Sequence, residues 1–196
     1  MRKGDATRQR ILEETQRQAA VKGFGAVSLG DVAQSVGLSK SGLFKHFESK
    51  EAMELAALDQ AFDRFVAFVW TPAQALPAGR ARLEAIFERW LDWQEVENAA
   101  GGCLIYAASV ELDDQPGPLR DLLHKRVRQW RRTLARELQA LRDPPLSEED
   151  AAGAAFQMKS FTLGHSDALR MLGDKNAKAA AQAAFAALLD RLERNA

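Results

Sequence analysis

The sequence predicts an all-α protein of about nine helices. Apolar residues recur at spacings of three and four along most of its 196 residues. Capping residues precede these runs, and Gly or Pro follows them, as at helix ends. No segment alternates polar and apolar residues over enough positions to predict a strand. Helices are predicted over residues 6–22, 49–70, 80–98, 103–112, 118–142 and 175–194, with another opening at Ser147 and two short ones before residue 48.

The two short helices are joined by a tight turn. Ser28 can cap the first of them, and Gly37 ends it, because a residue past the last turn often adopts a positive φ. Ser39 can cap the second helix, whose inner face carries Leu43 and Phe47. Such a pair allows the second helix to lie in the major groove of DNA. The pattern therefore predicts a helix–turn–helix.

Small polar and basic side chains occupy the outer side of this pair. In a recognition helix, phosphate contacts anchor the protein while base-edge contacts select the sequence. No Arg, Asn or Gln lies between Ser39 and Phe47, so selection is expected to depend on Lys40, small side chains and DNA shape. Arg2 and Lys3 are expected to form an arm before the first helix. The predicted DNA contacts are Ser28, Ser39, Lys40, Ser41, Gly42, Phe44, Lys45, His46 and Lys50.

This segment resembles the DNA-binding domain of the TetR/AcrR family of bacterial transcription regulators. The resemblance implies a helix–turn–helix domain over residues 1–48, linked by the helix over 49–70 to a helical regulatory and dimerisation domain over 49–196. Phe44 departs from the family, since many members have a Tyr there whose hydroxyl contacts a phosphate. The matching residues are Arg10-Ile11-Leu12, Gly23-Phe24, Ser28-Leu29, Asp31-Val32-Ala33, Val36-Gly37-Leu38-Ser39-Lys40, Leu43-Phe44, His46-Phe47 and Ser49-Lys50-Glu51.

Charge alone gives modest support for DNA binding. The chain has 27 Lys and Arg against 27 Asp and Glu. Residues 1–53 contain nine basic and six acidic side chains, a net charge of +3, so the remainder carries −3. An asymmetry of this size is compatible with a DNA-binding N-terminal part, but it does not establish one.

Aromatic residues are abundant between the fourth and eighth helices. In proteins resembling this family, the region encloses an inducer pocket, and such pockets are largely apolar with a few polar groups. An ordinary helical core is the alternative interpretation. The residues expected to line a pocket for a small, largely apolar effector are Phe62, Phe65, Phe87, Trp90, Cys103, Tyr106, Trp130, Phe161 and His165.

The last two helices are candidates for a homodimer interface. One helix–turn–helix contacts one half-site, and a dimer reaches two half-sites separated by whole turns of about 34 Å. The resemblance implies a four-helix bundle across a two-fold axis. The alternative is that these faces pack only within the monomer. The predicted interface residues are Ala155, Phe185, Leu188 and Leu192.

The sequence favours no enzyme, metal site or cofactor. Its three histidines lie far apart, and Glu111, Asp113 and Asp114 are expected to be a solvated acidic cluster. The single cysteine, Cys103, excludes an internal disulfide and is interpreted as a small buried side chain, with a thiol sensor as the alternative. No apolar run approaches about 18 residues, so a cytoplasmic protein with no membrane partner is expected.

Together these features predict a homodimeric regulator that binds double-stranded operator DNA. We expect a repressor that a small effector releases, although the sequence does not distinguish repression from activation. The alternative is a small-molecule-binding or interaction protein in which the helix–turn–helix is only structural.

Overall fold

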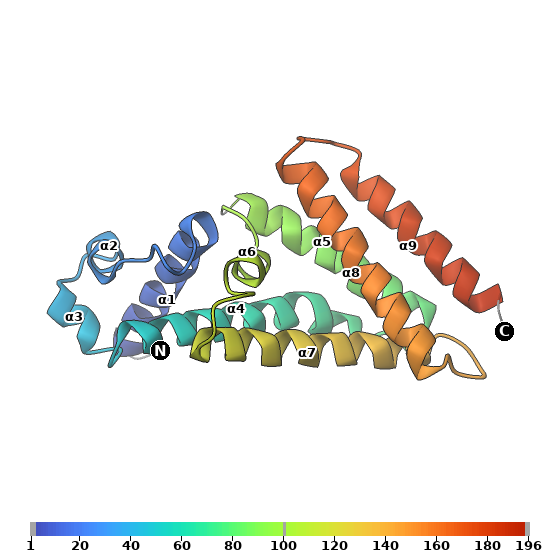
Figure 1. Ribbon diagram of the computed structural model, residues 1–196, viewed down its shortest axis with the longest axis horizontal. Helices are drawn as coiled ribbons and strands as arrows, with labels where there is room; N and C mark the ends of the chain where they lie inside the picture. The colour runs from blue at the N-terminus through green and yellow to red at the C-terminus, as the bar shows by residue number, and fades with distance from the viewer. Residues whose placement is uncertain (1–2, 100, 195–196) are drawn as a thin grey trace. The chain divides into compact units, whose positions relative to one another are not determined.

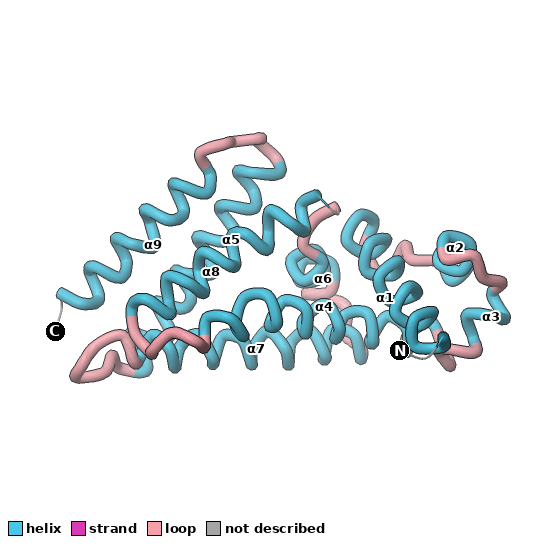
Figure 2. Tube along the Cα trace, turned by 180° about the vertical axis from the view of Figure 1, so that it is seen from behind, coloured by secondary structure: helices cyan, strands magenta, loops and turns pink. Residues whose placement is uncertain are grey.

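The computed structural model describes residues 3–99 and 101–194, and within these ranges it has nine helices and no strand (Figure 1, Figure 2). The all-α class predicted from the sequence is confirmed. The helices are α1 Lys3–Lys22, α2 Leu29–Ser35, α3 Lys40–Phe44, α4 Lys50–Ala73, α5 Arg80–Ala99, α6 Leu104–Glu111, α7 Pro118–Gln139, α8 Glu148–Arg170 and α9 Ala177–Arg194.

Helix α4 is longer than predicted, because it continues through Pro72 to Ala73 instead of ending at residue 70. A proline inside a helix cannot donate to the carbonyl four residues earlier. Here that carbonyl belongs to Phe68, and it accepts a hydrogen bond from Arg89 Nη1 at 3.3 Å. Arg89, a residue of α5, thus supplies the donor that the Phe68 carbonyl lacks, and the helix can continue past Pro72. The predicted end of α4 at residue 70 was wrong.

Helix α7 is shorter than predicted and ends at Gln139 rather than at residue 142. The Leu141 N–H donates to the Leu138 carbonyl at 3.1 Å, a bond to the third preceding residue that tightens the chain into a turn. The Gln139 carbonyl then accepts from the Leu146 N–H at 3.2 Å. These bonds satisfy carbonyl groups that the helix end leaves free.

The chain divides into two compact units. Unit 1 comprises the residues up to 64 together with 97–126, and unit 2 comprises 65–96 together with 127–196. Helices α4, α5 and α7 therefore each contribute to both units. The sequence predicted a boundary after residue 48, between a DNA-binding and a regulatory domain. The two packing units do not coincide with those domains, and the predicted boundary stays a prediction.

In unit 1, the helices of the predicted helix–turn–helix share one core. Helix α1 packs against α2 and α6, and α2 packs against α3. The Arg10 guanidinium adds a polar connection, because its Nη2 donates to the Val36 carbonyl at the end of α2 at 2.8 Å. The core side chains, each almost wholly buried, are Ile11, Leu12, Phe24, Val32, Leu43 and Phe47.

In unit 2, helices α8 and α9 lie side by side (Figure 1). The Phe87 ring of α5 stacks on the Phe185 ring of α9 with a centroid separation of 4.2 Å. Lys178 of α9 forms an ion pair with Asp92 of α5 at 2.5 Å. An apolar contact and an ion pair therefore both hold α9 on α5.

Replacing Phe185 with Ala should lower the free energy of unfolding by about 3–5 kcal/mol, because it removes a buried ring and leaves a cavity. Urea unfolding followed by circular dichroism measures the change. Met171→Ala is the control, since Met171 is 80% exposed and should change stability by less than about 0.5 kcal/mol. Equal losses in the two variants would contradict the importance of the stacked pair.

Candidate nucleic-acid interface

Serine caps define the start of both short helices. Ser28 Oγ accepts hydrogen bonds from the Gly30 and Asp31 N–H groups at 3.2 and 3.4 Å. Ser39 Oγ accepts from the Gly42 N–H at 3.1 Å, and α3 begins at the next residue. Each hydroxyl satisfies a donor that the helix start leaves free. Both predicted caps are present, whereas the predicted DNA contacts of these serines remain predictions.

Helix α3 ends at Phe44, so Lys45 and Phe47 follow the helix rather than belong to it, but the side chains of the segment divide as the sequence indicated. Leu43 and Phe47 are buried against the core, while Lys40, Ser41 and Lys45 are exposed. The Phe44 side chain is also 47% exposed, which is unusual for a large aromatic ring. The outer face therefore combines two amino groups, a hydroxyl and an aromatic ring that no core contact covers.

Gly42 has a structural reason within α3. A Cβ at this position would lie 3.3 Å from Ser39 Oγ and 3.6 Å from the Leu38 side chain. A Cβ would therefore press on the capping hydroxyl, which would have to shift by a few tenths of an ångström. This packing accounts for the glycine without any contact to DNA, and its predicted role at the interface is untested.

The predicted lysines differ in their surroundings. A Cβ built on Gly30 would meet Lys40 Cε at 3.0 Å, so the Lys40 chain lies along the first turn of α2. Lys50 instead forms an ion pair with Glu54 at 3.3 Å. Burial raises the pKa of Glu54, and the Lys50 charge opposes that rise. His46 is half-buried, whereas Lys45, like Lys40, is exposed.

Arg8 also lies at this surface, with its guanidinium 4.8 Å from the centre of the Phe47 ring. A cation over an aromatic face is favourable. This contact therefore connects α1 to Phe47, which lies three residues beyond the end of α3. The expected arm residue Arg2 lies outside the described residues, as does the side chain of Lys3.

Glu111 is the functional candidate that the sequence did not indicate. Its carboxylate accepts from the Phe24 N–H at 2.8 Å and from the Gly25 N–H at 2.7 Å. Gly23 has a φ of 81°, and a Cβ there would lie 3.0 Å from the same carboxylate. Glu111 therefore holds the corner between α1 and α2 and is not the solvated residue that was expected. Its partners lie more than 80 residues away in sequence, which no local pattern reveals.

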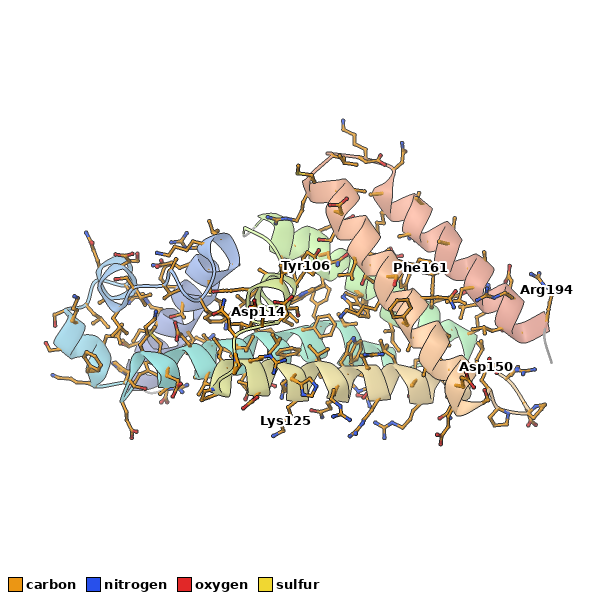
Figure 3. The ribbon with its side chains drawn as sticks, in the orientation of Figure 1. Tyr106, Asp114, Lys125, Asp150, Phe161 and Arg194 are labelled. Carbon is orange, nitrogen blue, oxygen red and sulfur yellow. The ribbon has the colours of Figure 1, made fainter. Side chains whose placement is uncertain are left out.

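The predicted pocket residues of unit 2 form an aromatic cluster only in part. Phe65, Trp90 and Trp130 meet edge to face, with centroid separations of 5.1–5.6 Å. Phe87 stacks on Phe185 instead, and Phe161, on α8, is half-buried (Figure 3). The remaining predicted residues, Phe62, Cys103 and Tyr106, belong to unit 1.

Unit 2 also holds two buried polar atoms of interest, one of which belongs to the aromatic cluster. His165 is 2% exposed, and its Nδ1 lies 2.7 Å from Gln94 Oε1. Among the described residues, neither His165 Nε2 nor Trp130 Nε1 has a hydrogen-bond partner. Burial lowers the pKa of His165, which favours the neutral ring. A buried polar atom without a partner is costly, so these two atoms require an explanation.

In unit 1, the three predicted pocket residues have separate environments. Phe62 is buried beneath the Arg126 guanidinium, which lies 5.4 Å from the ring centre. Cys103 occupies the cap position of α6, and Tyr106 is 41% exposed. The side chain of Arg126 is also paired with Asp59 and Asp63 of α4.

The predicted interface residues lie mostly inside the single chain. Ala155, Phe185 and Leu188 are buried, and Leu192 is half-buried. The exposed side of α8 carries Phe156 instead, with 64% of its surface accessible. The role of the four predicted residues in pairing two chains is untested.

Two family models match the chain. The model for "Bacterial regulatory proteins, tetR family" covers residues 11–57, and that for "Tetracyclin repressor-like, C-terminal domain" covers residues 79–185.

The chain belongs to the TetR family of bacterial regulatory proteins.

The resemblance inferred from the helix–turn–helix is therefore confirmed. The HTH-type transcriptional activator FasR of Mycolicibacterium smegmatis is 32% identical over 74 residues, which are 38% of this chain and 34% of FasR. The matches to curated relatives span only 18% and 34% of those proteins' lengths.

Solved structures of TetR-family proteins extend the likeness over the whole chain. A TetR transcriptional regulator from Chloroflexus aurantiacus is 26% identical with a TM-score of 0.77, over 97% of this chain and 96% of its own. AibR, in complex with isovaleryl coenzyme A and operator DNA, is 19% identical with a TM-score of 0.74, over 93% and 98%. At this identity, the likeness to AibR shows the fold alone.

Within residues 3–99 and 101–194, no helix is both long and apolar enough to span a membrane. The same ranges contain no group of three or more His, Cys, Asp and Glu side chains placed to hold a metal ion.

Glu14 in the TetR-type N-terminal domain predicts a dependence of stability on pH. Hydrogen bonds from Arg17 lower the pKa of Glu14 from 4.5 to about 2, and burial partly opposes them. Because the folded-state pKa is lowered, the stabilisation is present above pH 4.5 and is lost as the pH falls toward 2. In urea unfolding, the difference in the free energy of unfolding between wild type and Glu14→Gln should therefore decrease as the pH falls from 4.5 toward 2. Glu13→Gln is the exposed control; a gap that stays constant with pH would contradict the assignment.

Proposed function

We propose that this TetR-family chain is a sequence-specific DNA-binding transcription regulator that acts as a homodimer and responds to a small molecule. The observation that carries the proposal is the outer face of α3. Lys40 and Ser41 on the helix and Lys45 directly after it are exposed, and the segment is fixed by the buried Leu43 and Phe47. Basic and hydroxyl groups on a helix held in this way suit phosphate and base-edge contacts.

The charges of α3 support DNA binding over a purely structural helix–turn–helix. Among the described residues, neither Lys40 nor Lys45 is paired with a carboxylate. Phe44 likewise leaves nearly half of its surface exposed beside them. The two unpaired cations and the exposed ring contribute nothing to packing, so a purely structural role for the helix pair does not explain them. A phosphate backbone would neutralise the cations, and Phe44 would contact sugar or thymine methyl groups.

The aromatic cluster of unit 2 is the proposed effector site. Phe65, Trp90 and Trp130 supply an apolar wall, and the unpartnered Trp130 Nε1 and His165 Nε2 supply polar contacts. Such a combination is typical of small-molecule pockets. We propose an effector that is largely apolar and carries an acceptor for the Trp130 N–H. The ordinary-core alternative leaves both polar atoms unexplained.

The names of similar proteins support DNA binding and a response to a ligand, and they include both activation and repression. AibR has been crystallised with isovaleryl coenzyme A and operator DNA. FasR is named an activator, whereas the matching C-terminal model is described as tetracyclin repressor-like. We infer repression relieved by effector as the working mechanism. Effector binding would favour an arrangement of the dimer whose α3 helices no longer match the half-sites.

Dimerisation is proposed through the exposed sides of α8 and α9. Phe156 on α8 and the exposed Ala183 and Ala187 on α9 offer an apolar surface that the single chain leaves uncovered. Small residues allow helices to approach closely. Of the four residues predicted from the sequence, the half-buried Leu192 is the one still accessible to a partner.

Removing a lysine from α3 should weaken operator binding. Footprinting on DNA that flanks the gene of this chain would supply the operator fragment. Lys45→Ala should reduce the slope of log affinity against log salt by about 0.9 per protomer, because one phosphate contact is lost. Lys40→Ala should cost about 1–3 kcal/mol if it reads a base edge. Lys175→Ala, an exposed lysine of unit 2, is the control, and an unchanged slope for Lys45→Ala would contradict the interface.

A charge on the proposed dimer surface should separate the protomers. Phe156→Lys places an amino group where two apolar surfaces would meet, so analytical ultracentrifugation at micromolar concentration should show a shift from dimer to monomer. Phe156 is exposed in the single chain, so the fold should survive, and circular dichroism checks this. Val110→Lys, at a residue on α6 that is 62% exposed, is the control. A dimer unaffected by Phe156→Lys would place the interface elsewhere.

A further inference from the structure

A groove lined by three arginines lies between α7 and α8 in unit 2. Its volume is about 240 Å³. Helix α8 contributes only methyl side chains to it, so its width is set by small residues. The lining residues are Arg128, Arg131, Arg132, Ala135, Ala152 and Ala155. One wall is therefore strongly basic, and no carboxylate lies among the lining residues.

These three arginines have no acidic partner, whereas several other arginines of the described chain do. Arg80, Arg82 and Arg126 each form ion pairs with carboxylates on a neighbouring helix. Within the described residues, no ion pair involves Arg128, Arg131 or Arg132. Like charges held side by side repel one another, so an arrangement of this kind favours binding of an anion.

Lys159 adds to the positive charge at the groove. It lies four residues beyond Ala155 on α8, one helical turn along the same side. Burial lowers the pKa of Lys159, and the charge of Arg131 lowers it further. The Lys159 ammonium group thus lies close enough to Arg131 to be repelled by it.

We propose that the α7–α8 groove binds the phosphate or diphosphate end of a soluble ligand. The arginine guanidinium is planar and donates paired hydrogen bonds that match phosphate oxygens. The volume corresponds to about eight water molecules at roughly 30 Å³ each. It is below the roughly 300–1,000 Å³ of pockets that enclose a drug-sized molecule, so it suits an anionic end rather than an entire ligand.

The shape of the groove favours this ligand over a nucleic acid. A rigid duplex cannot enter a groove of this volume and would contact the guanidinium groups from outside. A phosphate at the end of a flexible molecule can enter and contact several arginines together. The inference uses none of the residues proposed for operator or effector binding, so it can fail while the proposed function holds.

Isothermal titration of the full chain with inorganic pyrophosphate tests the proposal. The double variant Arg131→Gln, Arg132→Gln should bind at least about tenfold more weakly, since it removes two guanidinium groups that would donate charged hydrogen bonds to the phosphate oxygens. Lys125→Gln, Arg136→Gln is the matched control, because it removes two exposed charges of α7 that do not line the groove. The control should bind within about twofold of wild type, and circular dichroism should show both variants folded.

The same variants distinguish the sources of phosphate. Vesicles of phosphatidylcholine with phosphatidic acid test a lipid headgroup, and the operator duplex tests DNA. Selective loss of pyrophosphate binding in the groove variant supports the proposal. Equal weakening in both double variants would mean a diffuse charge effect and would overturn it. No binding of pyrophosphate, or an effect of the groove variant confined to vesicles or duplex, would also overturn it.

Discussion

The DNA-facing surface depends on the burial of two side chains beneath a helix that cannot stand alone. Helix α3 has five residues, and isolated helices shorter than about 12–15 residues are marginal in water. Its position is therefore set by Leu43 and Phe47, which are 0% and 4% exposed, and by the Ser39 cap. Everything proposed for Lys40 and Lys45 rests on this packing, because a lysine selects a groove position only if its backbone is fixed.

A single carboxylate extends that constraint beyond the first three helices. Glu111, at the end of α6, accepts hydrogen bonds from the N–H groups of Phe24 and Gly25, between α1 and α2. Charge-assisted bonds of this kind are roughly twice as strong as neutral ones. Any displacement of α6 would have to break them or move the corner with it. Within unit 1, this gives the region outside the helix–turn–helix a direct mechanical connection to the DNA-binding surface.

Cations that hold helices together differ from cations available to a ligand in whether a carboxylate is paired with them. Lys178 and Arg80 are surrounded by carboxylates and hold α9 to α5, and hydrogen bonding to Asp92 raises the pKa of Lys178. Lys45, directly after α3, and the arginines at the α7–α8 groove have no such partner among the described residues. Overall net charge is zero and conceals this difference, since it is local pairing that decides whether a cation is available to a ligand.

The sequence by itself determined the helical class, the helix–turn–helix, its serine caps and the family, because capping, periodicity and turn residues act over only a few positions. Only the tertiary structure decided which aromatic residues meet: Phe87 joins Phe185, while Phe65, Trp90 and Trp130 cluster. Only the structure showed that α4 continues through Pro72 and that Glu111 accepts a hydrogen bond from the Phe24 N–H. These outcomes depend on partners from distant segments, and local sequence patterns contain no information about which segments will pack together.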